Sequence, residues 1–222
     1  MNKKVKTTTV KTTKGERKQK ILDSAERLFA IKGFEGVSVR EVTKNAGVDV
    51  ALANYYFNSK RGLFDAVLMR RAEILNEYRM EALEACEREA GDTPLTVEAI
   101  IDAYTHPLLD RSHLGGAGWK SYFSLIAQVN NSPEWGGIML PRYYDPIVRR
   151  FMDALRNAMP NSNEENLYWC YHFLSGALTL TFAETGRIDH LSNGLCKSKD
   201  LEAVHARLVP FITAGFNALC QE

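Results

Sequence analysis

The chain has 222 residues, of which 45% are hydrophobic and 25% are charged, as is ordinary for a globular protein. No apolar run is long enough to span a bilayer, and residues 1–13 lack the apolar middle of a signal peptide. The four cysteines are scattered without a CxxC pair, which indicates reduced thiols and argues against a disulfide framework or a zinc site. We therefore expect a cytoplasmic protein without a membrane partner, a cofactor or a metal.

Charge is divided unevenly along the chain, although the formal net charge is only +1. Residues 1–62 hold 14 Lys and Arg against 6 Asp and Glu, a net charge of +8, whereas residues 63–222 hold 14 against 21, a net charge of −7. A basic segment is attracted to phosphates and an acidic one is repelled by them. This division predicts nucleic-acid binding by the N-terminal end and argues against a protein that coats DNA non-specifically.

Residues 1–13 are rich in Lys and Thr and nearly lack apolar side chains, so we expect a disordered basic tail. The tail has two interpretations, a solubilising segment or an arm that lies along phosphates or in a minor groove. Residues 14–32 follow as an amphipathic helix, which Thr13 and Glu16 begin as a capping box and Gly33 ends. Its apolar stripe consists of Ile21, Ala25, Leu28 and Phe29.

Two short helices then meet at a tight turn over residues 46–48, Ala-Gly-Val. Ser38 and Glu41 cap the first helix, and Asp49 is placed to cap the second, which ends near Phe57. The inward positions of this region are Val39, Val42, Ala46 and Phe57. Two short helices that cross at such a turn form a helix-turn-helix, whose second helix lies in the DNA major groove.

The rest of the chain also shows helical periodicity. A long helix begins at Ser59 and ends before Gly91, and its apolar positions are Leu63, Phe64, Val67, Leu68, Leu75 and Tyr78. Further helices are predicted over residues 93–110, 119–130, 132–159, 162–185 and 200–219. Thr93, Ser132 and Ser162 are their expected N-terminal caps. Residues 115–118 are expected to form a loop and residues 187–199 a polar connection, and Pro210 is expected to kink the last helix or to remove one of its hydrogen bonds.

No segment shows the alternation of a strand, so the predicted fold is all-α. The predicted domains are a tail at 1–13, a helix-turn-helix head at 14–58, and a helical effector-binding and dimerisation domain at 59–222.

Three motifs in the head resemble the TetR family of transcriptional regulators. They are VTKNAGV at residues 42–48, NYYF at 54–57 and NSKRGL at 58–63, and the resemblance covers residues 17–68. Residues 49–57, with Leu52 and Tyr56 as departures, and the C-terminal segments 167–173 and 209–211 are similar to the fatty-acid-responsive PsrA-type subset. The resemblance implies a three-helix DNA-binding head and a helical C-terminal domain that dimerises and binds an effector.

Nine residues are predicted to contact DNA: Arg40, Thr43, Val50, Ala51, Leu52, Asn54, Tyr55, Tyr56 and Lys60. The amide of Asn54 suits an adenine edge or a phosphate, and the apolar residues 50–52 suit thymine methyl groups. Lys60, at the start of a helix, suits a phosphate, as do Arg40 and Thr43. The two tyrosines either donate hydrogen bonds to the DNA backbone or pack within the head.

One recognition helix reads only a few base pairs, so a specific site calls for a homodimer on a palindromic operator. The last two helices are the dimerisation face of the family. Their apolar residues are Leu167, Leu174, Leu178, Leu208, Phe211, Ile212, Phe216 and Leu219, with Gly176 and Gly215 allowing close approach. The alternative is that these residues only close the core of the monomer.

Aromatic residues concentrate in residues 119–182, which hold all three tryptophans. The predicted effector site consists of Trp119, Tyr122, Phe123, Ile126, Tyr143, Tyr144, Trp169, His172 and Phe173, although aromatic residues at helical spacing also make ordinary cores. The resemblance implies a hydrophobic effector such as a fatty acid, an acyl-CoA or an aromatic compound. The effector is expected to release DNA, and a corepressor would use the same parts.

An enzyme is the main rival interpretation. Cys170 and His172 stand at i and i+2, which places them on different faces of a helix, and His106, His113, His190 and His205 lie far apart in the sequence. No HExxH, GxSxG or phosphate-binding loop occurs, so the sequence predicts no catalytic residue.

Overall fold

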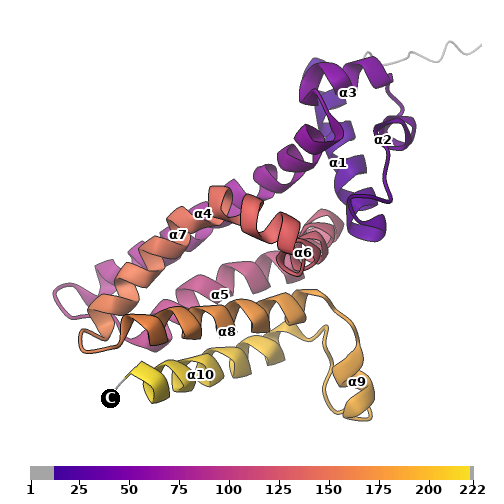
Figure 1. Ribbon diagram of the computed structural model, residues 1–222. Coiled ribbons are helices and arrows are strands. Elements are labelled where there is room, and N and C mark those ends of the chain that lie inside the picture. Colours follow the sequence, from indigo (N-terminus) through magenta and orange to yellow (C-terminus); the bar gives the residue numbers. More distant parts are fainter. Residues whose placement is uncertain (1–12, 221–222) are drawn as a thin grey trace, which may run out of the picture. The chain divides into compact units, whose positions relative to one another are not determined.

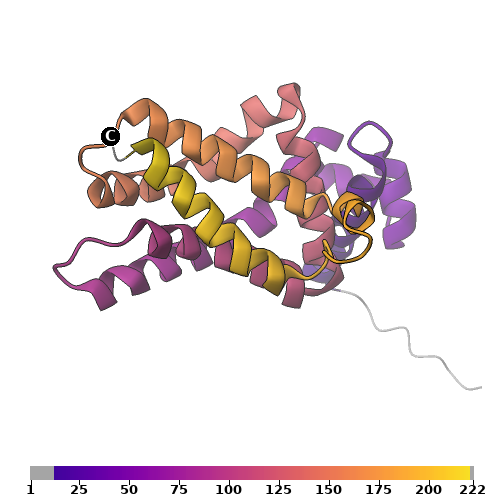
Figure 2. The ribbon, with the colours of Figure 1, turned by 90° about the horizontal axis from the view of Figure 1, so that it is seen from below.

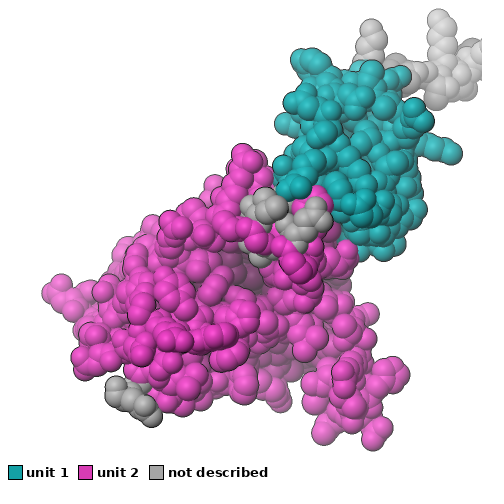
Figure 3. Space-filling view, in the orientation of Figure 1, with its two compact units in different colours: residues 1–67 teal, residues 68–222 magenta. Residues whose placement is uncertain are grey.

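The computed structural model describes residues 13–220, apart from the side chains at positions 134, 136 and 138–140 in α7. Within that part of the chain it contains ten helices and no strand, which confirms the all-α prediction (Figure 1). The predicted basic tail lies almost entirely outside the described residues. The chain divides into two compact units, residues 1–67 and residues 68–222 (Figure 3).

The first unit contains α1 (Lys14–Lys32), α2 (Val39–Ala46), α3 (Val50–Phe57) and the beginning of α4 (Lys60–Ala90). The predicted caps are confirmed. Thr13 and Glu16 form a reciprocal capping box, and the Ser38 hydroxyl accepts a hydrogen bond from the backbone N–H of Glu41. The Asp49 carboxylate accepts one from the N–H of Ala51, 2.7 Å away. Such caps each stabilise a helix by about 1 kcal/mol and fix where it begins.

The turn between α2 and α3 depends on Gly47, which adopts a left-handed conformation with φ 67° and ψ 36°. Its N–H and that of Val48 bond back to carbonyl groups of the last turn of α2. Only glycine takes this conformation without steric cost, so the residue sets the crossing of the two helices.

The core of the first unit extends into α4. The rings of Phe29 and Phe64 meet edge to face with centroids 5.0 Å apart, and Leu63 and Val67 are also buried. This packing explains why residues 60–67 group with the first unit, beyond the predicted head boundary at residue 58.

The second unit contains the rest of α4 and six further helices. They are α5 (Val97–Leu114), α6 (Gly116–Asn130), α7 (Pro133–Ala158), α8 (Glu164–Phe182), α9 (Arg187–Leu191) and α10 (Leu201–Cys220). Helices α8 and α10 run side by side, and α10 also packs against α5 (Figures 1 and 2). Buried apolar side chains of α5, α6 and α8 form the centre of this unit.

Several predicted boundaries are wrong. Two helix starts were misplaced because more than one residue near a helix start can form a cap. Thr96, not Thr93, caps α5, and Asn163, not Ser162, caps α8. Helix α5 continues past Asp110 to Leu114, so the predicted glycine loop is reduced to a single position, Gly115, before α6. The predicted polar connection contains the short helix α9, and α10 continues through Pro210, whose nitrogen has no hydrogen to donate within the helix.

By length and composition α10 could cross a membrane, which differs from the prediction that no segment is apolar enough. In the fold the helix packs against α5 and α8, with Leu208, Ile212 and Phe216 buried in the core. Packing within the second unit therefore accounts for part of the apolar character of α10, while Phe211 and Leu219 stay exposed.

Candidate functional site

The candidate nucleic-acid surface lies on α3 and the elements around it. Of the nine predicted contacts, Arg40, Ala51, Asn54 and Tyr55 are exposed, and Val50, Leu52, Tyr56 and Lys60 are half-buried. Thr43 is the exception, with only 1% of its surface exposed and its hydroxyl donating to the carbonyl of Arg40. The prediction that Thr43 contacts a phosphate is therefore corrected, because its side chain belongs to the core of the head.

Both tyrosines of α3 are tied to the beginning of α1. The Tyr56 hydroxyl donates a 2.8 Å hydrogen bond to the Lys14 carbonyl, while the ammonium of Lys14 donates a 3.1 Å bond to the Tyr55 hydroxyl. The bond to Tyr55 raises the pKa of Lys14. Tyr56 thus has the packing role that the sequence left open, and Tyr55, which is 66% exposed, keeps its ring on the surface.

Lys60 is engaged within the first unit. Its Nζ lies 4.2 Å from the centroid of the Phe34 ring and 3.7 Å from a carboxylate oxygen of Glu35. The predicted phosphate contact therefore requires the ammonium to exchange the Glu35 carboxylate for a DNA phosphate.

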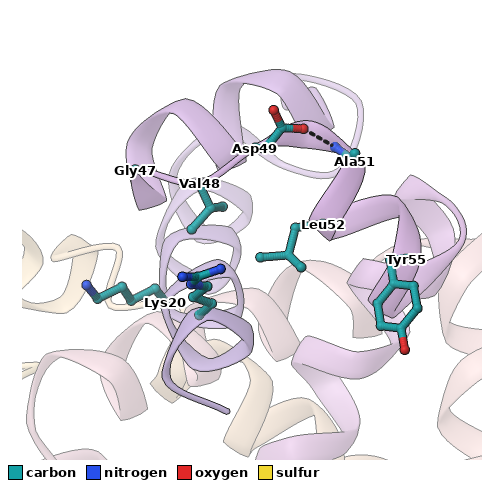
Figure 4. Close-up of a pocket in the computed structure, with 8 residues that line it drawn as sticks. Lys20, Gly47, Val48, Asp49, Ala51, Leu52 and Tyr55 are labelled. Atoms are coloured by element: carbon teal, nitrogen blue, oxygen red, sulfur yellow. Dashed lines mark hydrogen bonds between the residues drawn. The ribbon is translucent and has the colours of Figure 1, made fainter. Parts of the chain in front are cut away.

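A surface groove of about 580 Å³ runs between α1 and the beginning of α3 (Figure 4). Val48 and Leu52 point into it, and Asp49 is held away by its cap to α3. Arg17 and Lys20 of α1 supply its positive charge. Sequence reasoning missed these two cations as individual residues, although they belong to the basic segment that it identified by charge.

A cavity of about 670 Å³ lies in the second unit between α4, α5, α6, α7 and α8. Five predicted effector residues line it, namely Tyr122, Phe123, Ile126, Tyr144 and His172. The other four, Trp119, Tyr143, Trp169 and Phe173, are not part of its wall, and for these residues the prediction is corrected.

The reasons differ from residue to residue. Trp119 is buried in the core, stacked with Phe123 at 5.9 Å between ring centroids. Trp169 and Phe173 are stacked on each other on the exposed side of α8. Periodicity located the aromatic helices correctly but not the side of each helix that meets the cavity.

Polar groups of the cavity gather near Arg79 of α4, which sequence reasoning did not identify. The Tyr122 and Tyr144 hydroxyls are hydrogen-bonded to each other. Burial raises the pKa of Tyr144 to about 12 and also raises that of Tyr171, so both stay protonated at neutral pH. Arg79 is itself almost completely buried. The cavity thus combines an apolar wall with hydroxyl donors and one cation.

Comparisons with known proteins agree with this architecture. The profile of the bacterial regulatory proteins of the tetR family matches residues 21–67, and that of the tetracyclin repressor-like C-terminal domain matches residues 102–215, about half of the chain. The chain belongs to the TetR family. It is therefore a transcriptional regulator that binds DNA through its helix-turn-helix, and not an enzyme.

Three similar proteins illustrate the family. The negative transcriptional regulator IcaR of the biofilm operon icaADBC in Staphylococcus aureus is 30% identical over 157 residues, 68% of this chain and 77% of IcaR. The regulator YttP of Bacillus subtilis is 54% identical over 48 residues, which span 22% of this chain and only 23% of YttP. A TetR-family regulator from Shewanella sp. PV-4 shares the fold, with a TM-score of 0.63 at 18% identity, and the match covers 92% of this chain and 98% of that one.

Most of the residues predicted for the dimer face are buried within the single chain. Six of them are at most 8% exposed, and they are Leu167, Leu174, Leu178, Leu208, Ile212 and Phe216. These six close the core of the monomer, which is the alternative left open by the sequence. Of the predicted set, Phe211 and Leu219 remain exposed.

A different apolar surface is exposed on the same two helices. Trp169, Phe173 and Leu180 follow one another along α8 at helical spacing, and Phe211 of α10 is 72% exposed. A Cβ atom added at Gly176 or Gly215 would meet no neighbouring atom. Gly176 and Leu180 are also among the residues that line the cavity. We call Trp169, Phe173, Gly176, Leu180, Phe211 and Gly215 the α8–α10 face.

Two side-chain clusters form that the sequence spacing did not indicate. Cys170 and Cys220 lie together between α8 and α10, and burial raises the pKa of both thiols, that of Cys170 to about 12. Cys170 is buried while His172 is exposed, so the two do not form a nucleophile–base pair.

The other cluster joins α5 to α10. His205 Nε2 lies 2.7 Å from Asp102 Oδ1, and His106 Nδ1 lies 3.8 Å from Asp102 Oδ2. The three ligand atoms fall within 4.8 Å of one another, a set that a divalent metal ion can use. The prediction of no metal was drawn from the scattered cysteines, whereas this set consists of two histidines and an aspartate that the fold brings together.

Proposed function

We propose that this TetR-family protein is a ligand-responsive repressor that binds a palindromic operator as a homodimer and is released by a hydrophobic small molecule. The observation that carries the proposal is the course of α4. Its residues 60–67 belong to the core of the DNA-binding unit, and Leu75 and Arg79 of the same helix line the cavity of the second unit. A ligand in the cavity therefore touches the helix on which the head is built.

The proposed DNA contacts follow from exposure. Asn54, Tyr55 and Ala51 on α3 are free to approach base edges, and Arg17, Lys20 and Arg40 are placed for phosphates. Val50 and Leu52 are half-exposed beside them, and Lys60 completes the set after release from Glu35.

The proposed homodimer uses the α8–α10 face, because several large apolar side chains are exposed on these two packed helices, and exposed apolar surface of this kind often marks an interaction site. A second copy that meets the same face forms a closed two-fold dimer, which matches a palindromic operator. The two glycines would let the helices of the two copies approach closely.

Regulation follows from linkage between the two sites. An effector that binds better to the conformation unable to grip DNA weakens DNA binding by the same factor by which DNA weakens effector binding. The name of IcaR, a negative regulator, supports repression as the direction. The proposal has three further parts. The protein belongs to the PsrA-type subset, its effector is a fatty acid, an acyl-CoA or an aromatic compound, and it acts in the cytoplasm.

A genomic selection tests this function. Purified protein is mixed with sheared DNA of its source organism, and bound fragments are sequenced, with the Asn54→Ala protein treated in parallel. A few enriched palindromic sites that the variant loses would support a specific operator. Equal recovery of all fragments by both proteins would overturn it.

A further inference from the structure

Arg79 is a buried cation at the wall of the effector cavity. Only 3% of its surface is exposed, and it comes from the part of α4 that lies in the second unit. Its Nε donates a 3.1 Å hydrogen bond to the carbonyl of Tyr104, and its guanidinium lies 3.9 Å from the centroid of the Tyr104 ring. These contacts hold the planar group in place and use one of its five N–H donors.

The positive charge of Arg79 has no ion-pair partner among the described residues, since no carboxylate oxygen lies within 4.0 Å of its nitrogens. Asp145 is the acidic side chain in the cavity wall, but its carboxylate is 3.6 Å from Arg149 on the next turn of α7. Burying a charge without a partner is unfavourable, and an anion that enters the cavity would remove this cost.

The groups around Arg79 suit the head of an anionic ligand. Tyr144 and Tyr171 remain protonated and can donate hydrogen bonds to an oxygen anion. Apolar side chains such as Phe123, Leu178 and Phe182 make up much of the remaining wall, which also contains Asn130, Asn131 and Thr179. The cavity therefore offers a buried cation and hydroxyl donors to a charged head, and apolar side chains to the rest of a ligand.

We propose that Arg79 binds the carboxylate of an amphipathic monoacid that serves as the effector. A guanidinium matches the planar, two-oxygen geometry of a carboxylate. Among the described residues that line the cavity Arg79 is the one Lys or Arg, and this single charge suits a ligand with one negative charge better than a ligand with several, such as an acyl-CoA. This inference rests on the proposed function and narrows its effector to free carboxylic acids.

Binding of matched probes to the purified full-length protein tests the assignment. Calorimetry compares decanoate with 1-decanol, and 4-butylbenzoate with 4-butylbenzyl alcohol, because each pair differs in its charged head. We expect each acid to bind at least tenfold more tightly than its alcohol. In Arg79→Met the acids should lose at least tenfold in affinity while the alcohols change less than threefold.

The controls separate a ligand contact from a structural role. Arg88→Met removes an exposed cation from the same helix and should change neither ligand class. Arg79→Lys restores a charge and should recover part of the preference for acids, which keeps the test decisive if Arg79→Met does not fold.

Three results would overturn the assignment: alcohols that bind as tightly as acids, an acid preference that persists in Arg79→Met, or no binding of either acid. Operator binding is measured separately in a gel shift without probes. If the protein binds its operator but does not prefer acids to alcohols, the role of Arg79 is refuted and the proposed function as a repressor is not.

Discussion

The Tyr56 hydroxyl donates a hydrogen bond to the backbone carbonyl of Lys14, 42 positions earlier, and so joins the recognition helix to the first turn of α1. We expect Tyr56→Phe to lower the free energy of unfolding by about 1 kcal/mol, since the hydrogen bond that joins α3 to the Lys14 carbonyl is lost. Urea denaturation followed by circular dichroism measures the change. Tyr55→Phe is the matched control and should cost less, because its hydrogen bond is made with the flexible Lys14 side chain and not with the backbone. Equal losses in the two variants would contradict this role.

Lys20 should act on DNA through charge alone. Replacing it with Ala removes one phosphate contact, so the slope of log K against log salt should fall by about 0.9, with similar losses of affinity for operator and random DNA. Fluorescence anisotropy at several salt concentrations gives both values. Lys197→Ala removes an exposed cation from the second unit and should leave the slope unchanged. An unaltered slope in Lys20→Ala would exclude the groove as part of the DNA surface.

Asn54 should act on sequence discrimination. Asn54→Ala is expected to weaken operator binding by about 1–3 kcal/mol if the amide reads a base edge, with little effect on random DNA. Competition between the two DNAs measures the difference. A uniform loss on both would assign Asn54 to a phosphate instead.

Substitutions at two neighbouring residues of α10 should change dimerisation and stability separately. Phe211 is exposed and Ile212 is buried. Phe211→Glu places a charge on the α8–α10 face and should yield a folded monomer, whereas Ile212→Ala should keep the dimer but lose about 2–5 kcal/mol of stability. Light scattering after size-exclusion chromatography and thermal denaturation distinguish them. A Phe211→Glu protein that stays dimeric would move the interface elsewhere.

The cysteines should differ in reactivity. A thiol reacts as the thiolate, and burial raises the pKa of Cys170 to about 12, so at pH 8 its thiolate fraction should be over a hundredfold below that of an ordinary thiol of pKa about 8.5. Iodoacetamide labelling at pH 8 should therefore modify exposed Cys196 first, and labelling of Cys170 should rise with pH. Mass spectrometry of peptides reads the order. Early modification of Cys170 would show that α8 and α10 separate readily.

Most of the fold prediction depended on local sequence signals such as helix-capping residues. Thr13, Ser38 and Asp49 each cap the helix that the sequence assigned to them. A single capping residue stands directly before α2 and before α3, and next to Thr12 the spacing to Glu16 identifies Thr13. At α5 and α8, two capping residues stand close together, and local chemistry does not choose between them.

The faces of the second unit were harder to predict, because tertiary packing decides which apolar stripe is buried. Phe173 and Leu174 are adjacent apolar residues of α8, but one is exposed and the other is in the core. Arg79 is one of several arginines along α4, and its sequence neighbours do not distinguish it from exposed Arg88. Asp102 and His205 meet across 103 positions, which no local pattern reports.

Helix α4 runs for 31 residues without a loop where one compact unit gives way to the next. A head from another family member can therefore be grafted onto this effector domain only within a helix. The joint must conserve helical phase, since one inserted residue would turn everything beyond it by about 100°. Exchange of operator specificity among such regulators is thus constrained by residue count at the joint as well as by compatibility of the two cores.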